Sequence, residues 1–179
     1  MSDLRLDTPR LSLRLMRSSD LDDLLEIFGD PKVMASFGGA IFDRGQMERW
    51  LQRNIEHQEE HGYGLFSVIL KPQGQLIGDC GLEHMGIEGD LAFELGYDFR
   101  SDYWNQGFAT EAATAVRDYA FDVLQLPRLI SLIRVGNSAS RRVSEKIGMQ
   151  FECAFELNGI SYWKYAIDDK FAGIRGFGD

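Results

Sequence analysis

Cysteine is scarce in this sequence, and no metal-binding pattern accompanies it. Cys80 and Cys153 are the only cysteines among 179 residues, and both stand in apolar, strand-like segments. We expect two reduced thiols, as in a reducing compartment, with a disulfide or a nucleophilic cysteine as the alternatives. No CxxC and no His/Cys spacing typical of a metal site occurs, so we expect no metal ion.

Long apolar runs are also missing. The longest uninterrupted ones are a few residues, far short of the roughly 20 residues that span a bilayer. Residues 1–10 are charged and lack the apolar segment of a secretory signal. A cytoplasmic protein with no membrane partner is therefore the expectation.

Positive charge is in deficit, with 19 Lys and Arg against 28 Asp and Glu, a net charge of −9. Nucleic acid needs clustered basic side chains, so we expect no nucleic-acid partner. The negative field would attract a cationic substrate such as an amine, although net charge more often reflects solubility alone. The length fits one domain, predicted over residues 1–167, with a loose, glycine-containing tail over residues 168–179.

Apolar periodicity predicts an α+β fold with a mixed sheet of about seven strands and about four helices. The last two strands flank Asn158-Gly159, which is typical of a tight hairpin. The expected strands are 11–15, 63–70, 75–83, 91–99, 129–135, 149–157 and 160–167, and the expected helices are 20–28, 46–61, 107–124 and one from Asn137 to Gly148.

The stretch from Tyr103 to Ala112, YWNQGFATEA, lies between a strand and a helix. The free N–H groups of a helix start, with the helix dipole, form an anion site, so a phosphorylated ligand is indicated. Small residues at Gly107 and Ala109 would let a phosphate approach the main chain. The sequence contains neither the GxxxxGK[ST] phosphate loop nor the GxGxxG dinucleotide fingerprint at this place.

A third phosphate signature does fit. Gly107 and Ala109 match the acetyl-CoA loop pattern Gln/Arg-x-x-Gly-x-Gly/Ala, while Trp104 departs from its first position. The chain resembles the GCN5-related N-acetyltransferase (GNAT) superfamily, and in particular the RimJ/RimL branch that acetylates N-termini of ribosomal proteins. Further motifs carry the resemblance: L-x-T-x-R-L at Leu6–Leu11, Glu94–Tyr97, Asn137-x-x-Ser140 and Glu145–Met149. It extends from Leu6 to about Ile167.

The resemblance implies a mostly antiparallel sheet that splays where acetyl-CoA binds. Pantetheine would follow the main chain of Tyr97, Asp98 and Phe99. Asn137 would contact the cofactor from the opposite wall, with Ser140 and Arg141 beside it; a plain helix cap is the alternative for Asn137. The diphosphate would bind the loop of Trp104, Asn105, Gln106, Gly107, Phe108, Ala109 and Thr110.

The implied chemistry is direct attack of an amine on the thioester. Glu94 is the leading candidate for the base, because it faces away from the apolar side of its strand; a carboxylate bonded to a neighbouring strand is the alternative. His84, Glu83 and Asp90 are weaker candidates. Many relatives carry a tyrosine as the leaving-group acid where this chain has Ser144, which could relay a proton or simply be a solvated helix residue.

An α-amine, with a pKa of about 7.7–8.0, is easier to deprotonate than lysine at about 10.4. The acceptor amine is therefore expected to be a protein or peptide N-terminus, with a small-molecule amine as the alternative. An acyl-CoA sensor without catalysis and a nucleotide-binding regulator are the other hypotheses. Both a monomer and a homodimer are compatible with the sequence.

Overall fold

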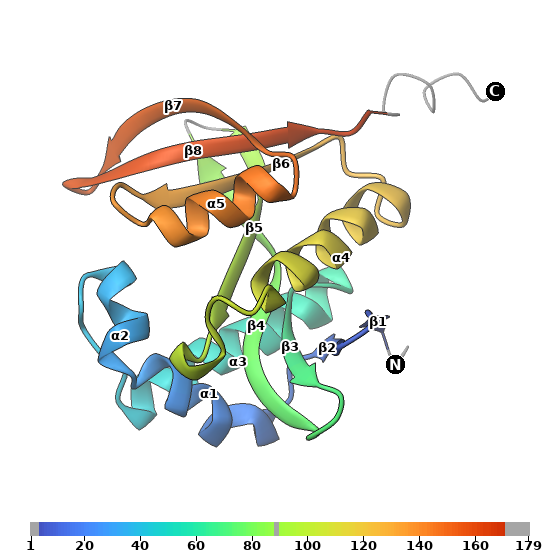
Figure 1. Cartoon of the computed structure of the whole chain (residues 1–179), viewed down its shortest axis with the longest axis vertical. Helices are drawn as coiled ribbons and strands as arrows, with labels where there is room; N and C mark the ends of the chain where they lie inside the picture. Colours follow the sequence, from blue (N-terminus) through green and yellow to red (C-terminus); the bar gives the residue numbers. More distant parts are fainter. Residues whose placement is uncertain (1–3, 88–89, 171–179) are drawn as a thin grey trace.

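The computed structural model describes residues 4–87 and 90–170 (Figure 1). Most of the expected tail, residues 171–179, lies outside the described residues. Residue 168 still belongs to the last strand.

One sheet of eight strands organises the chain, in the order β1-β2-β3-β4-β5-β6-β8-β7. Every neighbouring pair is antiparallel except β5 and β6. This confirms the α+β fold with a mixed, mostly antiparallel sheet. The strand that the sequence did not predict is β1, whose three residues are too few to show a periodicity. The strands are β1 Arg5–Asp7, β2 Leu11–Leu15, β3 Leu65–Leu70, β4 Gln75–Ile87, β5 Asp90–Phe99, β6 Arg128–Arg134, β7 Gln150–Leu157 and β8 Ile160–Asp168.

Five α-helices and three short 3-10 turns are present in the described residues. The unexpected helix is the single turn α2, which Pro31 starts and the Asp30 carboxylate caps by accepting from Lys32 N. The helices are α1 Leu21–Phe28, α2 Pro31–Met34, α3 Arg44–His61, α4 Phe108–Asp122 and α5 Ser138–Lys146, and the turns are Ser18–Asp20, Ala35–Phe37 and Ser101–Tyr103. None of these helices combines the length and the apolar content needed to cross a membrane.

Two hydrophobic cores lie on opposite faces of the sheet. One joins β2–β6 to α4, with Phe66, Leu82 and Val116 among its buried members. The other joins α1–α3 to the second face, around Leu24 and Met47. In Figure 1, α4 accordingly lies in front of the central strands and α3 passes behind them.

The sheet opens between β5 and β6. These strands pair only at Glu94 and Ile130, whereas β5 continues to Phe99 and β6 pairs with β8 along its whole length. The Ser131 hydroxyl donates to Leu95 O at 2.6 Å at the last point of contact. Beyond it the strands separate, which confirms the expected splay.

Candidate active site

The start of α4 lies beside this opening. Gly107 precedes the helix with φ of +82°, and Asn105 also has a left-handed backbone, with φ of +59°. In the described structure, the N–H groups of residues 105–110 have no hydrogen-bond acceptor from the protein. Because the helix dipole adds partial positive charge there, these amides form a site for an anion.

A carboxylate in the first turns of α4 fixes this loop to the N-terminal strands. Glu111 Oε1 accepts from the Thr8 hydroxyl at 2.6 Å and from Arg10 N at 2.9 Å. Burial acts to raise the pKa of Glu111, but the bonds from Thr8 and Arg10 outweigh it and lower the pKa. The T-x-R and A-T-E-A motifs, about a hundred residues apart in the sequence, are therefore two halves of one contact.

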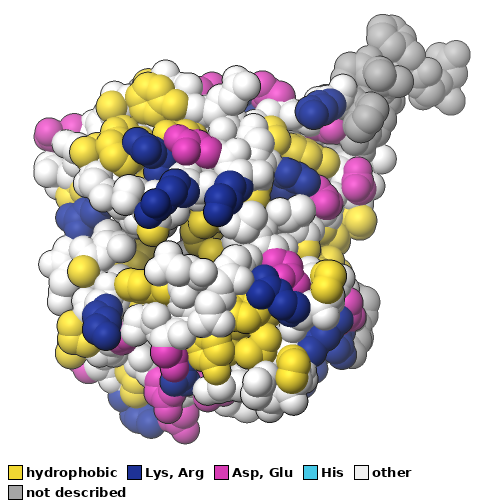
Figure 2. All heavy atoms as spheres, in the orientation of Figure 1, with side chains coloured by type: hydrophobic (Ala, Val, Ile, Leu, Met, Phe, Trp, Pro, Cys, Tyr) yellow, Lys and Arg dark blue, Asp and Glu magenta, His cyan; other side chains and the backbone are white. Residues whose placement is uncertain are grey.

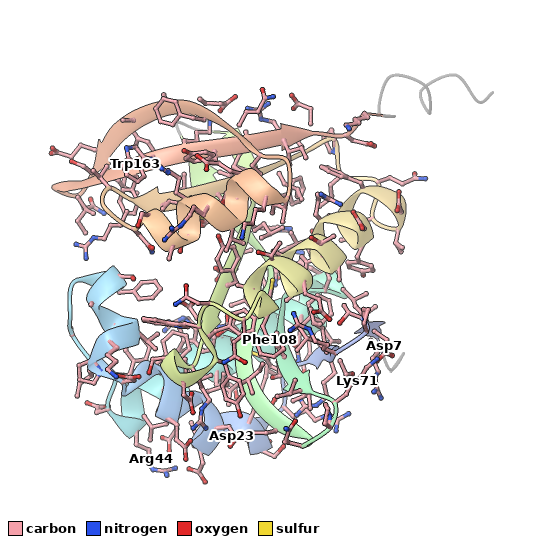
Figure 3. The ribbon with its side chains drawn as sticks, in the orientation of Figure 1. Asp7, Asp23, Arg44, Lys71, Phe108 and Trp163 are labelled. Atoms are coloured by element: carbon pink, nitrogen blue, oxygen red, sulfur yellow. The ribbon has the colours of Figure 1, made fainter. Side chains whose placement is uncertain are left out.

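Arg10 also supports the loop directly. Its Nη1 donates to Gln106 O at 3.0 Å, its Nε bonds Glu111 at 2.6 Å, and its guanidinium lies 4.2 Å from the Phe108 ring centroid. Figure 3 shows Phe108 at the start of α4. The sequence indicates Arg10 only as part of a motif and does not predict this role, because no local pattern links residue 10 to residue 106.

The side chain of Trp104 closes the loop onto the preceding strand. Its indole N–H donates to Phe99 O at 2.8 Å, and 43% of the residue stays exposed. Trp104, the position that departs from the family pattern, thus ties the loop to the end of β5. This bond engages one lone pair of a carbonyl that the sequence analysis assigned to pantetheine.

Helix α5 forms the wall across from α4. The Asn137 carboxamide accepts from Ser140 N at 3.1 Å, so the helix cap is formed. Three basic residues against one acid make α5 locally positive within an acidic chain: Arg141, Arg142 and Lys146 against Glu145. The Arg141 guanidinium lies 5.7 Å from the ring of Trp163, which Figure 3 places on β8 above this helix. On the face in Figure 2, Lys and Arg side chains gather above a central hollow.

Tyr97 crosses from β5 to α5. Its hydroxyl donates to Ser140 O at 2.8 Å and lies 3.5 Å from Ser144 Oγ. Ser144 is fully buried, so the alternative of a solvated serine is wrong. Burial raises the pKa of Tyr97, which keeps its proton at neutral pH. The sequence pointed to the main chain of Tyr97 alone and did not predict a role for this hydroxyl.

The opposite face of β4 and β5 carries four carboxyl groups. Asp79 pairs with Asp98 and Glu83 pairs with Glu94, with a glycine pair between them. Burial raises the pKa of Asp79 well above its usual value, and the charges of Asp98 and Glu83 add to it. Burial, then Glu83, raises the pKa of Asp98 to about 7. The Asp79–Asp98 pair therefore holds a proton at neutral pH.

A cavity of about 300 Å³ covers this face. Its floor includes Gly96, where an added Cβ would meet no atom within 4 Å. Aromatic side chains from α1, α3 and the segment between α2 and α3 enclose carboxyl groups from the strands. The lining includes Phe28, Phe37, Phe42 and Trp50 above, with Asp79, Glu83 and Asp98 below. Such a pocket suits a small cation.

The candidate bases differ in their hydrogen bonds and in the face of the sheet on which they lie. Glu94 Oε1 accepts from Leu132 N at 3.1 Å, which is the neighbouring-strand bond that the sequence left as an alternative. Burial raises the pKa of Glu94 to about 7, although the bond from Leu132 opposes this. Glu83 lines the cavity, whereas His84 lies on the other face and contacts the Tyr63 hydroxyl at 2.6 Å. The side chain of Asp90 lies outside the described residues.

A wider groove of about 830 Å³ follows α4 from Gly107 to Val123. It meets the anion site at Gly107 and Thr110, and Lys146 of α5 also lines it. Its other lining residues come from β1 and the turn after it, so the groove lies between β1 and α4, and none of its lining residues belongs to β5 or β6.

Comparison with known proteins agrees with this geometry. Residues 10–150 match the model of the acetyltransferase (GNAT) domain. YkkB of Bacillus subtilis is 37% identical over 148 residues, which cover 82% of this chain and 86% of that protein. A GNAT-family acetyltransferase of Bacillus anthracis has a TM-score of 0.80 at 28% identity, over 93% of this chain and 99% of that one. The chain belongs to the GNAT acetyltransferases.

The RimJ/RimL resemblance also has a structural counterpart. RimL, a ribosomal L7/L12 α-N-protein acetyltransferase solved in complex with coenzyme A, has a TM-score of 0.75 at 18% identity, over 92% of this chain and 98% of that one. At this identity the comparison shows a shared fold.

Proposed function

We propose that this acetyltransferase uses acetyl-CoA to acetylate a primary amine by direct attack, without an acyl-enzyme. The observation that carries the proposal is the set of unpartnered amides at residues 105–110, beside the opening between β5 and β6. Acetyl-CoA supplies the acetyl group as a thioester. The described residues fit it, because the amides offer a diphosphate site and α5 adds positive charge.

On the α4 side, the amides of Asn105 to Thr110 would hold the diphosphate. Asn137, Ser140 and Arg141 would contact the cofactor from α5. The main-chain groups of Tyr97 and Phe99 point to the same edge of β5 as Leu95 O, because alternate residues of a strand share an edge. That edge faces the opening, so Tyr97 N–H is placed to bind pantetheine or the oxyanion.

On the other side, the aromatic and acidic pocket would receive the amine. Its carboxyl groups attract the ammonium form, and Asp98 then takes the proton that must leave before attack. Asp98 is assigned as the base because it lines the cavity, with a pKa of about 7. Glu94 is the second candidate, since its pKa is also about 7 but its oxygen is bonded to Leu132.

The departing thiolate needs a proton. The Tyr97 hydroxyl keeps its proton at neutral pH and points toward α5, where Ser144 lies 3.5 Å away. We assign the acid to this pair, with Tyr97 as donor and Ser144 as the relay. Their positions compensate for the tyrosine that many relatives carry on this helix.

The first choice of acceptor is the α-amine of a peptide or protein N-terminus. Its low pKa suits bases that titrate near 7. A small-molecule amine is the second candidate, and the specific observation in its favour is the cavity of about 300 Å³, which is at the small end for ligand sites.

The test is an acetylation screen of N-terminal peptides against small amines, read by release of free CoASH, beside a direct titration with acetyl-CoA. Binding with turnover supports the enzyme. Binding without turnover on any amine supports an acyl-CoA sensor. No binding of acetyl-CoA, with binding of a nucleotide instead, would overturn the proposal.

A further inference from the structure

All three histidines of this chain meet at one place. His57 and His61 lie one turn apart on α3, and His84 lies on β4. One ligand nitrogen from each ring lies within 4.8 Å of the other two. The ring centroids are 4.1 Å apart for His61 and His84, and 4.5 Å apart for His57 and His61. His57 and His61 share one face of α3, and the β3–β4 hairpin brings the ring of His84 to that face.

We propose that His57, His61 and His84 bind one divalent transition-metal ion, with Zn²⁺ as the reference and an open position toward solvent. Imidazole nitrogen suits Zn²⁺, Ni²⁺ and Cu²⁺, whereas Mg²⁺ and Ca²⁺ prefer oxygen. Zn–N distances of about 2.0–2.1 Å at a tetrahedral ion place the nitrogens about 3.3 Å apart. The nitrogens would therefore have to approach one another by at most about 1.5 Å, which side-chain rotation can supply.

The hydrogen bonds of the cluster favour a cation over a purely structural role. His57 Nε2 is buried and has no hydrogen-bond partner among the described residues. Its ring is held by a hydrogen bond with the backbone of Tyr63, and the Tyr63 hydroxyl contacts His84 Nε2 at 2.6 Å. Outer partners of this kind orient metal-binding imidazoles.

The site is separate from the proposed acetyl-transfer residues. His84 contacts Phe93 and Tyr63 of the core under α4. Its neighbour Glu83 points to the opposite face of β4 and lines the proposed amine pocket. The ion would cross-link the end of α3 to β4, two elements that also supply Trp50 and Asp79 to that pocket. Because the site forms only in the folded chain, bound metal should stabilise the fold.

The test titrates tag-free protein with Zn²⁺ and Mg²⁺ by calorimetry, and with Co²⁺ by visible absorption. The background is Cys153→Ser, because Cys153 is an exposed thiol that could bind Zn²⁺ itself. The ligand variants are His61→Ala and His84→Ala. The matched control is Glu59→Ala, which removes an exposed charge from the same turn of α3.

The expected result is one Zn²⁺ per chain, no Mg²⁺ binding, Co²⁺ absorption bands typical of nitrogen ligands, and a melting temperature raised by Zn²⁺. Each ligand variant should bind Zn²⁺ at least about tenfold more weakly, and Glu59→Ala should bind as the background does. Zn²⁺ binding no tighter than Mg²⁺ binding, or unchanged in His61→Ala, would overturn the proposal. Circular dichroism checks folding; should His84→Ala not fold, the half-buried His61 carries the comparison.

Discussion

The two faces of β5 present different groups and have different proposed roles. On one face, Leu95 and Phe99 are buried against the core under α4, and Tyr97 reaches α5. On the other, Gly96 and Asp98 line the cavity that is proposed to receive the amine. The cofactor side depends on main-chain geometry, at a helix start and an open strand edge. The proposed acceptor side depends on side chains. Variants on the two faces should therefore separate acetyl-CoA binding from use of the amine.

Gly107→Val should have the largest effect, a loss of acetyl-CoA binding of about 100-fold or more. A branched side chain at φ of +82° is strained by about 1–3 kcal/mol and blocks approach to the amides. Calorimetric titration with acetyl-CoA measures this.

Gly74→Val is the matched control, because Gly74 also has a positive φ, of +64°, and open space around it, but lies in the β3–β4 turn. Equal acetyl-CoA affinities for the two variants would argue against the amide site.

Asp98→Asn should lower turnover by about 10²-fold and leave the acetyl-CoA affinity unchanged, because it removes the proposed base. In the wild type, turnover should rise with pH through about 7 as Asp98 loses its proton. A pH profile of kcat/KM for each protein measures both effects.

The same substitution should stabilise the free protein at high pH. The folded pKa of Asp98 lies above the ordinary value of 3.8, so its burial costs stability increasingly as pH rises from about 4 to 7. Asp98→Asn should thus unfold at higher urea than the wild type at pH 8 and at nearly equal urea near pH 4. A lower midpoint at pH 8 would contradict the buried carboxyl pair.

Gly96→Val should raise the KM for the amine about tenfold while acetyl-CoA binds normally. The added methyl groups enter open space above β5, so the fold tolerates them and the pocket shrinks. Steady-state kinetics with both substrates varied gives the two constants separately. If the variant weakens acetyl-CoA binding instead, the two faces are not independent.

Trp104→Phe should have the smallest effect. It removes the bond to Phe99 O and leaves an aromatic ring, so the free energy of unfolding should fall by about 1 kcal/mol. Acetyl-CoA affinity should fall only a few fold. Urea denaturation measures the change in stability, and calorimetric titration measures the acetyl-CoA affinity. A loss of affinity comparable to that of Gly107→Val would make Trp104 a direct cofactor contact.

Local patterns predicted most of the fold. The alternation of apolar and polar residues correctly placed Glu94 and Asp98 on the face of β5 opposite Tyr97. The predicted hairpin turn at Asn158-Gly159 is also present, and both turn residues have positive φ. The pattern could not show register, so it missed that Asp79 lies directly across from Asp98.

Contacts between segments far apart in the sequence could not be predicted either. Arg10 meets Gln106, and His84 joins two histidines of α3, only because the strands bring them together. The candidate bases illustrate the consequence, since Glu94 is the most conspicuous carboxylate in the strand pattern but Asp98 lines the pocket. Sequence periodicity gives the face of a residue, and tertiary packing decides what covers that face.

The most direct test of the central claim is a crystal structure of this protein soaked with coenzyme A. The diphosphate oxygens should lie within about 3.2 Å of main-chain nitrogens between Asn105 and Thr110, with the pantetheine arm entering the gap between β5 and β6. A diphosphate bound elsewhere, or amides at the start of α4 that bond to the protein itself, would contradict it.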